Sequence, residues 1–105
     1  MRPEPYEGIV VLDGRPRAFS TRGAVLLADD AVFDGANWER GGRNRFLYRA
    51  AGGGFALVTQ SRRAGEPPIV AEALSLEGAI TVYQSLPAHR VDLPEAFPGL
   101  SVDPL

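Results

Sequence analysis

The alternation of apolar and polar side chains between residues 45 and 61 predicts a β-hairpin. Residues 45–50 and 55–61 each alternate with a period of two, and a Gly-rich segment, residues 52–54, separates them. In the first run, Phe46 and Tyr48 share one face and Leu47 and Arg49 share the other. A further short apolar run at residues 69–73 follows Pro67 and Pro68 and predicts one more strand.

The spacing of apolar residues changes after residue 74 and predicts an amphipathic helix over residues 75–86. Ser75 is a suitable N-cap, and Glu77 lies in the first turn, where a negative charge is favourable. Pro87 ends the helix, because a residue before proline is disfavoured in the α conformation. One apolar stripe on this helix contains Leu76, Ala79, Ile80, Tyr83 and Leu86.

The first half of the chain predicts further short strands. Residues 9–12 and 17–21 can pair across an Asp13-Gly14 turn, with Pro16 at the start of the second strand. The apolar run at residues 24–28 is compatible with a strand or with a buried turn of helix. Residues 29–44 are rich in Asp, Asn and Gly and predict a loop with at most one helical turn.

These elements predict an α+β fold: a small antiparallel β-meander of four to six short strands, with the helix at 75–86 packed on one face. Residues 1–105 form a single predicted domain, in which 1–8 are a loose lead-in and 87–105 a proline-rich extended tail. The predicted core consists of Phe46 or Leu47, Phe55, Leu57, Ile69, Leu76, Ile80, Tyr83 and Leu86.

Composition narrows the range of functions. The chain has no cysteine, which excludes disulfides, thiol catalysis and thiolate metal sites and fits a reducing compartment. The N-terminus lacks the apolar stretch of a signal peptide, and no apolar run approaches the roughly 18 residues of a membrane span. We therefore expect a cytoplasmic protein with no membrane partner.

Charge is distributed unevenly and marks a candidate contact surface. Residues 38–63 contain six arginines and one acid, whereas residues 64–105 contain six acids and one arginine. Arginines interleaved with aromatic rings can bind phosphates and stack bases, but the formal net charge of −2 disfavours a dedicated nucleic-acid binder. The candidate nucleic-acid or partner contacts are Trp38, Arg40, Arg43, Arg45, Tyr48, Arg49, Arg62 and Arg63.

Other short motifs are better explained by structure than by chemistry. Gly14-Arg15-Pro16 overlaps the core of an AT-hook, yet the acidic Asp13 replaces the arginine before it, so a β-turn is favoured. The acids Asp29, Asp30 and Asp34 lack the spacing of an oxygen-ligand loop and are interpreted as turn or cap residues. His89, the only histidine, follows the helix and suits a surface or capping role. No catalytic residue, metal site or cofactor is predicted.

We therefore expect a non-enzymatic interaction or accessory module that self-associates or binds a partner protein. The first alternative is nucleic-acid binding through the arginine-rich segment 38–63. The second is a small ligand-binding or enzymatic domain, with a pocket between sheet and helix that has Glu72, Tyr83 or His89 at its rim.

Overall fold

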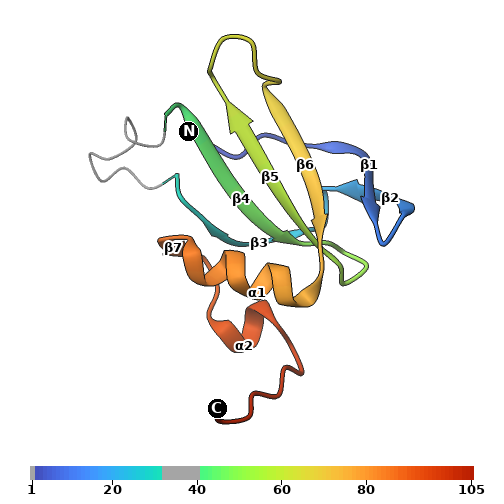
Figure 1. The fold of residues 1–105 in the computed structure, drawn as a ribbon, viewed down its shortest axis with the longest axis vertical. Coiled ribbons are helices and arrows are strands. Elements are labelled where there is room, and N and C mark those ends of the chain that lie inside the picture. Colours follow the sequence, from blue (N-terminus) through green and yellow to red (C-terminus); the bar gives the residue numbers. More distant parts are fainter. Residues whose placement is uncertain (1, 32–40) are drawn as a thin grey trace.

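The computed structural model describes residues 2–31 and 41–105, which form two antiparallel sheets and two helices (Figure 1). A hairpin of β1 (Glu7–Leu12) and β2 (Arg15–Ser20) makes a two-stranded sheet. The second sheet has the order β6-β5-β4-β3-β7. Its strands are β3 (Val25–Asp29), β4 (Arg43–Arg49), β5 (Phe55–Ser61), β6 (Ile69–Leu74) and β7 (Ala88–His89). Helix α1 (Leu76–Ser85) precedes β7, and the short α2 (Leu93–Ala96) follows it.

The five-stranded sheet is covered on both faces. Leu47 and Leu57 are paired across β4 and β5 and belong to the apolar cluster that contains Tyr83 of α1. Their neighbours Phe46 and Val58 pair on the opposite face and belong to the cluster that contains the hairpin. The molecule therefore has three layers, with the hairpin, the sheet and the helices in that order.

The α+β class is confirmed, and so is a helix packed on one face of antiparallel strands. Residues 24–28, which the pattern left open, lie largely in strand β3. The Asp13-Gly14 turn is present: both residues have positive φ, +52° and +72°, as a two-residue hairpin turn of the I′ type requires. Ser75 caps α1 by accepting a hydrogen bond from the Gly78 backbone N–H at 3.1 Å.

Four details of the prediction are wrong. The first two strands do not continue one meander but form a separate sheet on the other face, because Val10 and Phe19 pack against β4–β6. Leu76, the first residue of α1, is 43% exposed and not part of the buried core. The segment after Pro87 is not extended throughout, because it forms β7 and α2 and buries Phe97.

The fourth difference concerns the N-terminal lead-in, which is attached to the sheet. The side chain of Gln60 in β5 is 2% exposed. It accepts a hydrogen bond from the Glu4 backbone N–H at 2.7 Å and donates one to the Arg2 carbonyl at 2.9 Å. A buried amide that bonds a strand-like segment in this way fixes that segment over the hairpin face of β5.

Candidate functional site

The candidate arginines of β4 share one face of the strand, and two of them form ion pairs. Arg43 donates from Nε to Glu66 Oε2 at 2.9 Å, and its Nη2 contacts the other Glu66 oxygen. Arg45 Nε lies 3.8 Å from Asp30 Oδ2. Arg49 instead donates from Nη2 to the backbone carbonyl of Glu95 at 3.2 Å. Most of the positive charge on this strand is therefore balanced within the chain.

Glu66, in the loop between β5 and β6, is the centre of one arginine cluster. Hydrogen bonds from Arg43 and Ser61 lower its carboxyl pKa from 4.5 to about 2, with a smaller effect of the Arg63 charge. Arg63 Nη1 lies 3.6 Å from the same carboxylate. Because two arginines share this one acid, the cluster keeps a net charge of about +1 on the surface.

The remaining candidate contacts are not gathered around these arginines. Tyr48 is 6% exposed and lies on the hairpin face, where burial and then the charge of Asp29 raise its pKa. Arg62 is exposed in the β5–β6 loop and has no ion pair within the described part of the chain. Trp38 and Arg40 lie outside the described residues. The predicted platform of arginines and aromatic rings is thus divided between two faces of the sheet.

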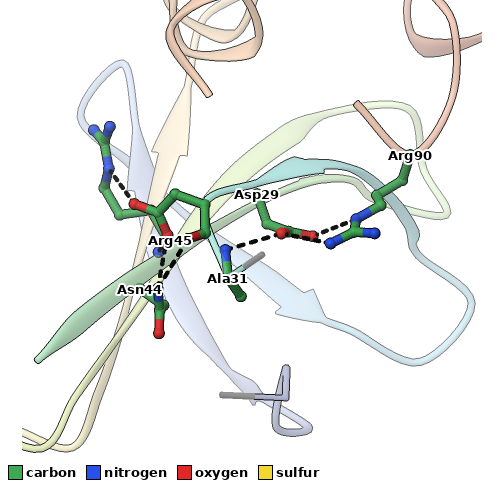
Figure 2. Close-up of polar contacts among 6 residues, drawn as sticks. Asp29, Ala31, Asn44, Arg45 and Arg90 are labelled. Atoms are coloured by element: carbon green, nitrogen blue, oxygen red, sulfur yellow. Dashed lines mark hydrogen bonds and ion pairs between the residues drawn. The ribbon is translucent and has the colours of Figure 1, made fainter. Parts of the chain in front are cut away.

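Two buried aspartates at the end of β3 form the most extensive polar cluster (Figure 2). Asp29 is 1% exposed and accepts two hydrogen bonds from Arg90, at 2.8 and 2.9 Å, and one from the Ala31 backbone N–H at 3.0 Å. The bidentate arrangement is the strongest geometry available to an arginine and a carboxylate. The pair joins β3 to the residue that follows β7.

Asp30 faces the other neighbouring strand. Its Oδ1 accepts hydrogen bonds from the Asn44 side chain at 3.1 Å and from the Arg45 backbone N–H at 2.8 Å. Asn44 is 6% exposed and also donates to the Asp30 carbonyl at 3.2 Å. Asp29 bonds the backbone two residues further on, as a turn residue does. The prediction did not include the burial of Asp29 and Asp30 or their bonds to Arg90 and to β4. Asp34 lies outside the described residues.

The corner between α1 and β7 contains the only histidine of the sequence. The His89 ring stacks on Tyr83 with a centroid distance of 3.9 Å, and its Nε2 lies 2.8 Å from the Tyr83 carbonyl oxygen. The Tyr83 hydroxyl donates to the Val91 carbonyl at 2.7 Å. The Tyr83 carbonyl belongs to the last turn of α1, so His89 occupies the capping position expected from the sequence.

A shallow hollow of about 550 Å³ lies beside this corner and is lined in part by Tyr83, His89 and Arg90. Each of these three side chains already has a partner: the Val91 carbonyl, the Tyr83 carbonyl and Asp29. These three side chains therefore make contacts that join β3, α1 and the segment after it.

The outer face of the hairpin is apolar and exposed. Ile9 is 73% exposed and Val11 63% exposed, although both lie in a regular strand. Ala18 and Pro16, which pair with them across the hairpin, are exposed as well. One signal of this surface is present in the sequence, since all four residues 9–12 are apolar and one strand face can bury only half of them.

Similarity to known proteins gives no independent assignment of this site: no family model, no curated protein and no solved structure matches the chain. Within residues 2–31 and 41–105, no three His, Cys, Asp or Glu side chains come together as metal ligands. None of the described helices is long and apolar enough to cross a membrane. The residues themselves therefore carry the functional argument.

Proposed function

We propose that the protein is a non-enzymatic interaction module that self-associates through strand β1. A single observation carries this proposal: β1 combines an exposed apolar face with an edge that no described strand occupies. A contiguous apolar surface on a regular strand is uncommon in proteins that act alone. A cytoplasmic location, expected from the cysteine-free sequence, belongs to the same proposal.

The hydrogen-bond pattern of the hairpin identifies the groups on this edge. The Thr21 N–H donates to the Tyr6 carbonyl at 2.9 Å, so residues 6 and 21 are a hydrogen-bonded pair. Hydrogen-bonded pairs recur at every second residue, which directs the backbone groups of Gly8, Val10 and Leu12 toward β2. The N–H and C=O groups of Glu7, Ile9 and Val11 consequently point away from β2; we call them the β1 edge.

The two edges of the hairpin differ in their protection against pairing. Pro16 lies opposite Val11, so the N–H that proline lacks is missing from the outer edge of β2. The β1 edge has neither a proline nor a basic residue to block it. A second copy of the chain therefore finds an unblocked strand at β1 and a blocked one at β2.

Antiparallel pairing of two β1 strands around a two-fold axis at Ile9 would join the hairpins into one four-stranded sheet. Such an interface is isologous, because each copy contributes the same strand. On its outer face the two Ile9 side chains would lie opposite each other, and each Val11 would lie opposite Glu7 of the other copy. This one interface would provide hydrogen-bond partners for the backbone groups of the β1 edge and would also cover part of the exposed apolar surface.

A symmetric disulfide tests this arrangement, since the natural sequence has no cysteine. In the proposed register the two Ile9 Cα atoms lie about 5.5 Å apart, within the range that a disulfide spans. Ile9→Cys should therefore form a covalent dimer rapidly under mild oxidation. Val102→Cys, at a valine that is 74% exposed in the C-terminal segment, is the matched control. Equal rates of cross-linking for the two variants would refute the proposal.

Nucleic-acid contact through the arginines is less well supported. Arg43 and Arg45 are paired with Glu66 and Asp30, and Tyr48 faces the opposite side of the sheet. A ligand phosphate would have to displace both carboxylates from these arginines. The self-association proposal needs no such rearrangement, and we favour it for that reason.

A further inference from the structure

A second surface, on the helix side of the sheet, contains a cavity of about 640 Å³. It lies between the β4–β5 turn, the first turn of α1 and the segment that follows α2. Phe55, Leu76, Phe97 and Leu100 form most of its apolar wall, and the rings of Phe55 and Phe97 are 5.2 Å apart. This volume is within the usual range of small-molecule sites.

Leu76 gives the cavity an apolar rim. It is the first residue of α1 and remains 43% exposed, whereas Ala79 and Tyr83 on the same helix are buried. The exposed part of Leu76 adjoins the apolar wall formed by Phe55, Phe97 and Leu100. An apolar molecule in the cavity would cover this side chain and gain the corresponding hydrophobic stabilisation.

Arg49 is the one charged side chain among the residues that line the cavity. It lies on the same face of β4 as Arg43 and Arg45, which both pair with carboxylates, but it has no such partner in residues 2–31 and 41–105. Its Nη2 is held by the Glu95 carbonyl, and its Nε–H is buried without an acceptor in the described part of the chain. A buried donor without an acceptor is unfavourable, so an added acceptor is favoured here.

We propose that this cavity binds a small organic acid. The carboxylate of this acid lies against the Arg49 guanidinium and accepts hydrogen bonds from its unused N–H groups. A small rotation of the Arg49 side chain brings its Nε–H into contact as well. Its apolar body lies among Phe55, Leu76 and Leu100. Guanidinium and carboxylate form paired charge-assisted hydrogen bonds, which explains why an arginine suits this wall. The site is separate from β1, so this proposal is independent of the proposal of self-association.

The test compares 4-phenylbutyrate with the uncharged 4-phenylbutyramide, which has the same apolar body. Titration calorimetry should show saturable one-to-one binding of the acid, with affinity at least about tenfold above that of the amide. In 1H–15N spectra of the unaltered protein, the Arg49 Nε–H signal should shift during the same titration. Equal binding of the two compounds, or an acid titration that leaves this signal in place, overturns the proposal.

Two variants with a control locate the site. Arg49→Gln should weaken binding of 4-phenylbutyrate about tenfold or more, because the charge and the paired donors are lost. Leu76→Asp, at a half-exposed position that the fold does not need to bury, should weaken it by placing a like charge at the rim. Arg45→Gln removes an arginine from the same strand face outside the cavity and should bind as the unaltered chain does. Loss of binding in the Arg45 variant instead would overturn the assignment.

Discussion

At the scale of single residues, the arginines of β4 differ mainly in the groups that accept their hydrogen bonds. Arg43 has the Glu66 carboxylate, Arg45 has Asp30, and Arg49 has only a backbone carbonyl. The sequence showed where these arginines are, but it did not show their partners, because Glu66 and Glu95 reach them only through tertiary contacts. A block of charge in the sequence is therefore a poor guide to the charge that a surface offers to a ligand.

The acid Glu66 leads to a prediction about pH. Its pKa is about 2 in the folded protein and near 4.5 in an unfolded chain, so its contribution to stability is present above pH 4.5. That contribution is lost as the pH falls from 4.5 to 2. Glu66→Gln should therefore lower the melting temperature at pH 6, and the difference from the unaltered protein should shrink toward pH 2.

A direct titration by NMR checks the cause. In Arg43→Gln, the side-chain carboxyl carbon of Glu66 should titrate closer to pH 4.5 than in the unaltered protein, because the hydrogen bond that lowers its pKa most is gone. Arg62→Gln is the matched control, since Arg62 is a neighbouring exposed arginine without an ion pair in the described residues. If both variants leave the midpoint near pH 2, Arg43 is not its source.

At the scale of elements, the pattern of hydrophobic positions identified the strands and the helix but not how they stack. The alternation placed Phe46 and Leu47 on opposite faces of one strand and left open which of them lies in the core, whereas both are buried. The alternation could not indicate that the β1–β2 hairpin forms the second layer. A separate two-stranded hairpin and two further strands of the same sheet have the same local pattern of apolar residues. The contacts of Val10 and Phe19 decide this, and they connect residues far apart in sequence.

The shortest strand, β7, is followed by a residue in a buried ion pair, which leads to a prediction about stability. β7 has two residues, and Arg90 directly after it binds the buried Asp29. Arg90→Ala leaves a buried carboxylate without its cation; because the Arg90 side chain is 44% exposed and water can partly replace it, we expect a loss of about 2 kcal/mol in the free energy of unfolding. Urea denaturation measures this loss.

Two companion variants separate the ion pair from a general effect of losing an arginine. Arg22→Ala removes an exposed arginine and should change the stability by less than about 0.5 kcal/mol. Asp29→Asn in the Arg90→Ala background should restore part of the loss, since it removes the buried charge that Arg90 neutralised. A double variant as unstable as Arg90→Ala would argue against this explanation.

At the scale of the whole molecule, the chain has two apolar clusters on either side of one sheet and a third apolar surface that faces outward. The first cluster is built on Leu47 and Tyr83, and the second on Phe46 and Phe19. The outward surface around Ile9 and Val11 is unlike both, because nothing in the described chain covers it. A small protein buries a limited fraction of its surface and is therefore only marginally stable. Covering this apolar surface with a second copy would increase the stability of the folded state.

Self-association through β1 therefore predicts that stability depends on protein concentration. Binding between folded copies stabilises the folded state by mass action, so a roughly hundredfold rise in concentration should raise the melting temperature by several degrees. Ile9→Lys should abolish this dependence, because the two lysines would lie directly opposite each other at the two-fold axis. Val102→Lys places a lysine at a residue outside the hairpin with nearly the same exposure as Ile9, 74% against 73%, and should preserve the dependence. A melting temperature that is independent of concentration in the unaltered protein would show that the β1 edge remains unoccupied in solution.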